Sequence, residues 1–279
     1  MGLALASAVM YGLSDFAGGW LSRRTSVWSL AVVTQVTAML AIGLLAAVMP
    51  GRPAAEHWTW GAVAGLGTGA GTAFLYRGLA AGRMGVVAPL SAVGAALLPV
   101  LVGVVTGERP PLLTWVGIAI AFPAIWLVST SDGGQDGEAR RDPVGSGVVD
   151  GLLAGVGFGL MFAALGQVPG TAGLGPLALA EVTSIGAVIA LAVGMRTSWL
   201  PRDRATWWGI VVGALAAAAA VLFLFATQAG LLTVASVLSS LYPAVTVLLA
   251  ATVLRERVHA MQAVGLVLAI AAVALVAAG

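Results

Sequence analysis

Ten apolar segments, each about 20 residues long, account for nearly the whole chain of 279 residues. A helix of that length crosses the hydrocarbon core of a bilayer, where only helices and closed barrels satisfy their backbone hydrogen bonds. Only 9% of the residues are charged, whereas soluble domains carry roughly a quarter. We therefore predict an all-α integral membrane protein with ten transmembrane helices at 3–21, 27–49, 59–79, 84–106, 111–129, 147–167, 173–195, 206–228, 231–254 and 260–278.

The residue types that are missing exclude several kinds of chemistry. The chain has no cysteine, which excludes disulfides and thiolate metal sites, and no lysine, which excludes Schiff-base catalysis. Its two histidines, His57 and His259, fall between apolar segments. The net charge of +2 is typical of loop arginines that orient spans, not of a nucleic-acid-binding surface. We expect no cofactor, no metal site and no nucleic-acid partner.

The two halves of the chain are similar in sequence. Aligning residues 81–128 with 229–276 without gaps gives 16 identities in 48 positions, where composition alone would give roughly 5. We predict a first five-helix repeat at 1–130, a polar linker at 131–146 and a second five-helix repeat at 147–279. Because five is an odd number of crossings, the second repeat enters the bilayer from the opposite side, which makes the two repeats inverted.

Two turns and one proline-containing run carry a family resemblance. The turns are GERP and RERV, after the fourth and ninth predicted spans, and the run is LYPAVTVLLAATVLRERV at 241–258. Together with the five-plus-five arrangement, they resemble the EamA-type branch of the drug/metabolite transporter superfamily. The resemblance implies a secondary transporter that exports amino acids, other metabolites or drugs by alternating access, and its motifs name no substrate.

Two acidic residues, Asp15 and Glu181, lie well inside predicted spans. A charged side chain at the centre of a span costs roughly 2.5–3.5 kcal/mol, so such residues usually face a bundle interior or an aqueous cavity. We expect both to line the transport pathway and to bind protons or substrate. The alternative is a carboxylate bonded permanently to helix-end amides or to an arginine. Gln35, which aligns with Glu181 in the repeat, is expected to face the same cavity.

Gln228 and Arg77, two polar residues near span ends, are weaker candidates. Gln228 could give a neutral hydrogen bond to substrate, although polar residues at span ends are more often interfacial. Arg77 could bind a substrate carboxylate or neutralise Asp15, although snorkelling towards the interface is the stronger interpretation.

Prolines in the fourth and ninth spans predict kinked or broken helices. Pro243 follows the hydroxyl-rich run SVLSSLY, and the corresponding stretch VAPLSAVGAALLP contains Pro89 and Pro99. Proline removes a backbone hydrogen bond, and broken helices in transporters often present the freed groups to substrate. The alternative is that the small residues around these prolines only allow close helix packing. On the first interpretation, the candidate substrate-binding residues are Ser91, Ser239 and Tyr242.

Two further motifs are interpreted as structural. Glu108-Arg109 and Glu256-Arg257 recur at equivalent turns and predict helix-end pairing and capping. The pattern GxGxG at 65–69 lies inside a span with no lysine after it, so it predicts close helix packing and not a phosphate loop.

The polar residues predict a cavity near the middle of the membrane, lined by spans 1, 2, 4, 6, 7 and 9. Spans 5 and 10 carry no charged residue and are expected outside it. Of the 13 arginines, 11 lie in or beside the loops after odd-numbered spans and 2 in the loops after even-numbered spans. The positive-inside rule then predicts that the odd loops are cytoplasmic and that both termini face outward.

These observations together predict a secondary transporter and no enzyme, because intramembrane catalysis would have only Asp15 and Glu181 available. A membrane-embedded sensor or scaffold stays open as an alternative. The expected partners are a small-molecule substrate and the lipid bilayer, and a homodimer is left open. The expected location is a bacterial cell membrane, which the chain would cross many times.

Overall fold

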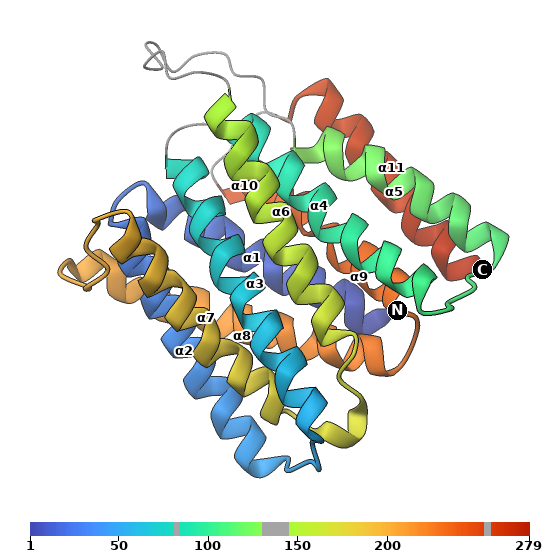
Figure 1. Cartoon of the computed structure of the whole chain (residues 1–279). Coiled ribbons are helices and arrows are strands. Elements are labelled where there is room, and N and C mark those ends of the chain that lie inside the picture. Colours follow the sequence, from blue (N-terminus) through green and yellow to red (C-terminus); the bar gives the residue numbers. More distant parts are fainter. Residues whose placement is uncertain (81–83, 130–144, 254–257) are drawn as a thin grey trace.

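The computed structural model describes residues 1–80, 84–129, 145–253 and 258–279, and helices dominate these segments (Figure 1). The predicted linker, apart from its last two residues, and the Glu256-Arg257 pair lie outside the described residues. The helices are α1 (Gly2–Ser22), α2 (Val27–Val48), α3 (Ala55–Ala80), α4 (Met84–Val105), α5 (Leu112–Ser129), α6 (Gly145–Leu165), α7 (Gly175–Gly194), α8 (Gly209–Gln228), α9 (Leu232–Ser239), α10 (Tyr242–Val253) and α11 (Ala260–Ala278), with short 3-10 helices η1 (Gly170–Ala172) and η2 (Arg204–Trp208).

A helix occupies each of the ten predicted segments, and the ninth segment is divided into α9 and α10. Within the described residues, six segments are long and apolar enough to cross a membrane by length and composition: 27–48, 147–165, 175–194, 204–228, 232–253 and 260–278. Two shorter apolar helices cover 90–105 and 112–128. These features fit an all-α membrane protein.

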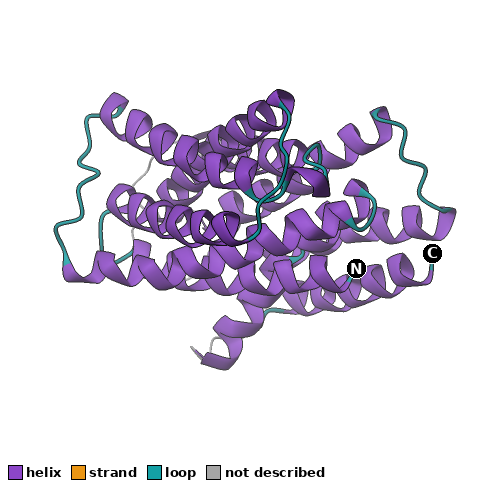
Figure 2. Cartoon of the chain, turned by 90° about the horizontal axis from the view of Figure 1, so that it is seen from below, coloured by secondary structure: helices purple, strands orange, loops and turns teal. Residues whose placement is uncertain are grey.

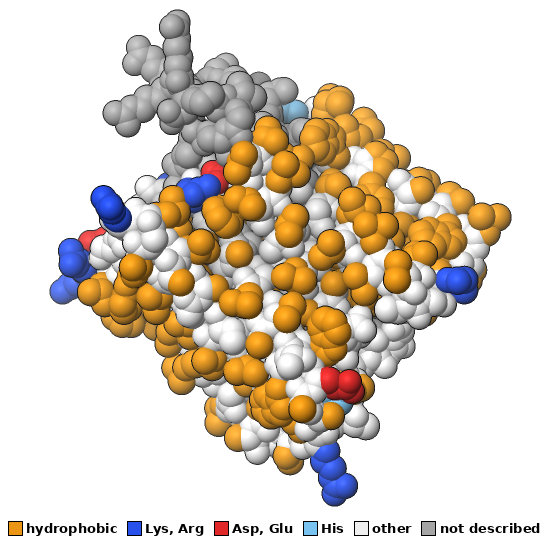
Figure 3. All heavy atoms as spheres, viewed as in Figure 1, with side chains coloured by type: hydrophobic (Ala, Val, Ile, Leu, Met, Phe, Trp, Pro, Cys, Tyr) orange, Lys and Arg blue, Asp and Glu red, His pale blue; other side chains and the backbone are white. Residues whose placement is uncertain are grey.

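The surface has the polarity that a bilayer requires. On the face seen in Figure 3, charged side chains gather at two opposite edges, and the surface between them is apolar or uncharged. Exposed large apolar side chains include Leu44 on α2 and Ile270 on α11, which are 70% and 72% exposed. Such exposure is unfavourable in water and favourable in lipid.

Helices of one half pack mainly on helices of the other half. α3 packs along α6 and α7, and α8 packs along α1 and α2; α4 contacts α6, and α1 contacts α9 and α10. α5 and α11 form a pair at one edge of the bundle (Figure 1). Exchanging α1–α5 for α6–α11 maps these contacts onto one another, as a two-fold arrangement would. The inverted repeat itself stays a prediction.

The glycine pattern at 65–69 lies on α3 where α3 contacts α6 and α7. A Cβ atom on Gly65 would collide with the carbonyl of Ala180 on α7, and one on Gly67 would lie 2.5 Å from the carbonyl of Gly157 on α6. Glycine therefore allows the backbones to approach closely, as small residues do in other membrane bundles. This agrees with the interpretation of the motif as packing.

The ninth predicted span breaks at the position that its proline predicts. α9 ends at Ser239, two turn residues follow, and α10 begins at Tyr242 with Pro243 as its second residue. Proline is tolerated there because the first residues of a helix have no intrahelical partner for their N–H groups. By contrast, α4 continues through Pro99 as one helix, and the side chain of Pro89 lies outside the described ones.

Both termini lie at the same end of the bundle in two perpendicular views (Figures 1 and 2). Met1 and Gly279 also line a common surface hollow with Thr114 and Ala229. An even number of crossings places both termini on one side, so this arrangement agrees with ten spans.

Candidate functional site

A cavity lies between the two sets of helices and is lined by α1, α2, α3, α6, α7, α8 and α10. Among the described residues, none of α4, α5 or α11 lines it. The fourth span was expected to line the cavity, but α3 and α8 do so instead. They hold central positions because each packs along two helices of the other half.

Asp15 on α1 and Glu181 on α7 both line this cavity. Glu181 is 5% exposed, and its Oε2 atom is buried without a hydrogen-bond partner. The ion pairs between described residues are Glu56 with His57 and Arg77 with Asp150, so neither cavity acid is paired with a described cation. No described lining residue is basic. The structure therefore does not support permanent pairing of either acid with a described arginine.

Gln35 lies in the same cavity and joins two of its walls. Its side-chain nitrogen donates a hydrogen bond to the hydroxyl of Ser184 on α7, at 2.5 Å. Gln35 is 3% exposed and Ser184 is fully buried. This bond connects α2 with α7 three residues from Glu181, so it restrains the helix that carries the acid.

Three tyrosines from different helices line the cavity: Tyr11 on α1, Tyr76 on α3 and Tyr242 on α10. The ring centroid of Tyr11 lies 6.3 Å from that of Tyr242 and 5.8 Å from that of Phe162 on α6. Phe162, which aligns with Asp15 in the repeat, stacks on Phe223 of α8 at 4.2 Å. The hydroxyl of Tyr11 is buried without a hydrogen-bond partner. The acids therefore share their cavity with aromatic side chains.

Sequence reasoning missed Tyr11 and Tyr76, although a helical spacing points to both. Tyr11 precedes Asp15 by four residues, so the two side chains project from one face of α1. On α3, Thr68, Thr72 and Tyr76 follow one another at intervals of four and all line the cavity. The signal is a polar stripe on an otherwise apolar helix.

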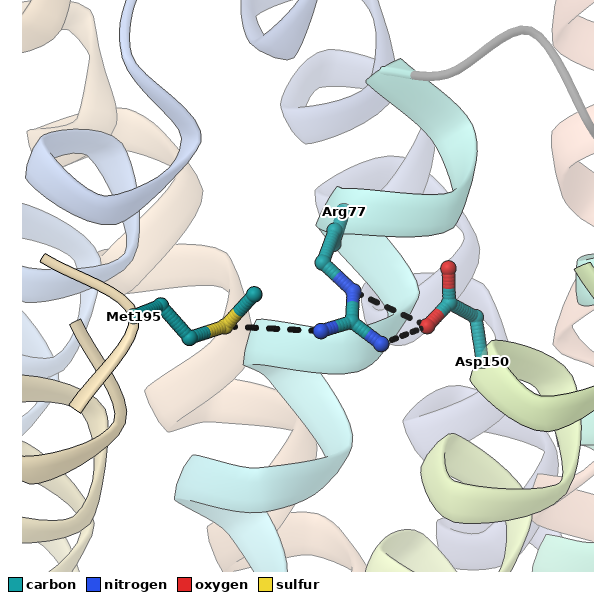
Figure 4. Close-up of polar contacts among 3 residues, drawn as sticks. All are labelled: Arg77, Asp150 and Met195. Atoms are coloured by element: carbon teal, nitrogen blue, oxygen red, sulfur yellow. Dashed lines mark hydrogen bonds and ion pairs between the residues drawn. The ribbon is translucent and has the colours of Figure 1, made fainter. Parts of the chain in front are cut away.

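Arg77 does not line the cavity but pairs with Asp150 near the start of α6 (Figure 4). Its Nε and Nη2 atoms both donate to Oδ1 of Asp150, the former at 2.9 Å, and Nη1 donates to the sulfur of Met195 at 3.4 Å. The side chain of Asp150 is 3% exposed and that of Arg77 is 31% exposed. Asp150, not Asp15, is the acid that Arg77 neutralises.

The remaining candidates, except Tyr242, lie outside the cavity lining. The hydroxyl of Ser239 donates to the carbonyl of Ala4 on α1 at 3.3 Å, which joins α9 to α1. The side chain of Gln228 donates to the carbonyl of Val168 at 3.4 Å, beyond the end of α6. Ser91 is buried on α4, which does not line the cavity. These positions favour helix packing for Ser239 and Gln228.

Glu108, which we interpreted as a capping residue, caps a helix of the other half. Gly107, with a φ of +101°, turns the chain after α4 in a conformation that favours glycine. The Glu108 carboxylate then accepts hydrogen bonds from the backbone N–H groups of Leu232, at 2.6 Å, and Thr233, at 2.9 Å. Acidic caps at helix N-termini satisfy free N–H groups and interact favourably with the helix dipole.

Replacing Glu108 with Ala is expected to lower the free energy of unfolding by about 1–2 kcal/mol, because the first turn of α9 loses both acceptors. Thermal and denaturant unfolding of the purified protein in detergent measures the change. Glu56→Ala, which removes an exposed acid from the first turn of α3, is the matched control. Equal changes in the two variants would contradict the capping role.

The fold and cavity define a polytopic membrane protein with a polar, acid-bearing site between two groups of helices. A family model, the EamA-like transporter family, matches residues 1–130 and 145–278. The chain belongs to this family, which is part of the drug/metabolite transporter superfamily and consists of transporters, not enzymes. It is therefore a multi-pass membrane transporter of this type.

Comparison with individual proteins supports the fold of the chain and no more than the fold. A solved structure named "Crystal structure of protein" is similar to 98% of this chain, and 94% of that chain is covered. The two have 18% sequence identity and a TM-score of 0.69. No curated protein matches this chain significantly.

Proposed function

We propose that this chain exports small organic solutes from a bacterial cell by alternating access, with proton binding at Asp15 and Glu181 coupled to solute binding. The observation that carries the proposal is the presence of two acids in one cavity without a described cation beside them. Apolar side chains such as Leu75 and Met161 line the same cavity as the acids, a combination typical of small-molecule sites.

Proton and solute can compete for the same carboxylates. A carboxylate in a bundle interior is costly unless its charge is offset, and a proton, a cationic group or hydrogen-bond donors on a solute can each do so. If the solute and the proton exclude one another, the proton gradient drives the solute in the opposite direction. This is the chemical basis of the proposed coupling.

Alternating access would use the reciprocal packing of the two halves. α3 lies between α6 and α7, and α8 lies between α1 and α2, with the cavity among these helices. Rocking of one group against the other would expose the cavity first to one side and then to the other, as in other transporters with inverted repeats.

Counterflow in proteoliposomes tests the proposal. Vesicles containing the purified protein are loaded with one unlabelled solute from a panel of amino acids, amines, carboxylates and nucleobases, and uptake of the labelled solute is followed with and without an imposed pH gradient. We expect saturable counterflow for at least one solute and faster net transport under the gradient. Absence of counterflow for the whole panel would overturn the transport proposal, and gradient-independent flux would overturn proton coupling.

Orientation is a separate prediction of the arginine distribution. The described arginines of the odd loops are Arg23, Arg24, Arg196, Arg202 and Arg204, and those of the even loops are Arg52 and Arg109. We expect a reporter that is active only outside the cytoplasm to be active when fused after Gly279, because the arginine-rich side stays inside. Activity of a matched cytoplasmic reporter at the same position would contradict this orientation.

A further inference from the structure

The charge of the cavity lining is unfavourable for anionic solutes. Asp15 and Glu181 contribute two carboxylates, and no described lining residue is basic. Arg77, the one described arginine within a lining helix, donates to Asp150 from two of its nitrogens and is not available to a solute. An anionic solute would meet like charges without a fixed cation, which is unfavourable where little water screens them.

The aromatic side chains of the lining favour a cationic solute. Tyr11, Tyr76 and Tyr242 line the cavity from three helices, together with Asp15 and Glu181. The face of an aromatic ring attracts a cation electrostatically. Carboxylates and ring faces together form the usual protein environment for organic ammonium groups.

Four buried polar atoms of the lining have no hydrogen-bond partner among the described residues: Oε2 of Glu181 and the hydroxyls of Tyr11, Thr34 and Tyr242. Oε2 of Glu181 has no hydrogen-bond partner although the residue is 5% exposed, and it belongs to a side chain that lines the cavity. Buried acceptors in proteins are nearly always satisfied. A solute that carries N–H donors on a positive group would satisfy this oxygen and offset its charge.

We infer that the solute is a small organic cation, an ammonium or related group on an apolar body, held between the carboxylates of Asp15 and Glu181 and the rings of Tyr11, Tyr76 and Tyr242. Leu75, Met161 and Ala220 supply apolar surface in the same cavity for the body of the solute. This inference rests on the proposed transport function for its biological meaning, but binding can be measured without transport.

Equilibrium dialysis with the purified full chain in detergent measures this binding. The probes are benzyltrimethylammonium and phenethylamine as cations, phenylalanine as a zwitterion and phenylacetate as an anion, all built on one aromatic body. We expect saturable binding of at least one cation, and no displacement of that cation by a hundredfold excess of phenylacetate. The inference would be overturned if neither cation binds saturably. It would also be overturned if phenylacetate or phenylalanine displaces the labelled cation at the same concentration as the unlabelled cation does.

Variants locate the bound cation. Asp15→Asn and Glu181→Gln are each expected to weaken cation binding by about tenfold or more, equivalent to about 1.4 kcal/mol. Glu56→Gln, an exposed acid outside the cavity, should bind like the wild type. Tyr11→Phe should retain binding and Tyr11→Leu should weaken it, because the ring face and not the hydroxyl contacts the cation. Thermal unfolding identifies variants that do not fold, and those are omitted from the comparison.

Unchanged affinity in both folded acid variants would overturn the inference, and so would equal loss in the two Tyr11 variants. The outcome for transport is separate. Cation binding without counterflow would leave the inference standing and overturn the transport proposal. Counterflow of other solutes with no cation binding would overturn the inference alone.

Discussion

Asp15→Asn is expected to lower pH-driven transport strongly while leaving expression and folding intact. Asparagine keeps the size of the side chain and its ability to accept a hydrogen bond, but it cannot bind and release a proton. A carboxylate inside a span costs roughly 2.5–3.5 kcal/mol when its charge is not offset, which corresponds to about a hundredfold in an equilibrium constant. We therefore expect flux driven by a pH gradient in proteoliposomes to fall by roughly tenfold to hundredfold.

Glu181→Gln and Glu56→Gln complete this experiment. Glu181 lines the same cavity, so its variant shows whether one acid or both couple the proton. Glu56 is an exposed acid at the start of α3, and its variant should transport like the wild type. Wild-type flux with wild-type pH dependence in both cavity variants would contradict proton coupling at this site.

Arg77→Met is expected to destabilise the protein by about 2–4 kcal/mol. The substitution leaves the carboxylate of Asp150, which is 3% exposed, without its only described cation. Removing one partner of a buried pair commonly costs about 3–5 kcal/mol, and the expected value here is lower because Arg77 is 31% exposed and partly solvated. Denaturant unfolding in detergent measures the loss.

The double variant Arg77→Met with Asp150→Leu separates pairing from packing. Replacing both charges with apolar groups of similar size should recover more than half of the lost stability, because no buried charge is left unpaired. Arg52→Met, an exposed arginine between α2 and α3, is the control and should change stability little. Equal stability of the single and double variants would mean that the ion pair is not what holds this part of α3 to α6.

The positions of the helices followed from sequence with errors of a few residues. α1 covers Gly2–Ser22 where 3–21 was predicted, and α7 covers Gly175–Gly194 where 173–195 was predicted. In α3 the difference is larger, because its first turn extends past the apolar segment through Glu56 and His57. Apolar length predicts the part of a helix that lies in lipid, whereas the ends depend on polar residues that are compatible with helix or loop.

The side-chain contacts between helices could not be predicted from the lengths of the apolar segments. Arg77 was a candidate partner for Asp15, but it pairs with Asp150, which is 73 residues away in sequence and lies on α6. Ser239 was a candidate for binding substrate, but its hydroxyl is used in a contact with α1. Each outcome depends on how a helix is rotated about its axis, and the few polar side chains of these helices do not specify which neighbouring helix each of them contacts.

The sequence by itself determined the class of protein, the number and position of its helical segments, and the break before Pro243. Backbone groups in lipid must bond within their own helix, so a run of about 20 apolar residues has one stable conformation. The tertiary structure alone decided the contacts that the sequence did not predict: Tyr11 and Tyr76 in the cavity with Asp15 and Glu181, and Arg77 paired with Asp150. Lipid is as apolar as the side chains, so neighbours are chosen by close packing at small residues such as Gly65 and Gly67, and that choice exists only once the helices are assembled.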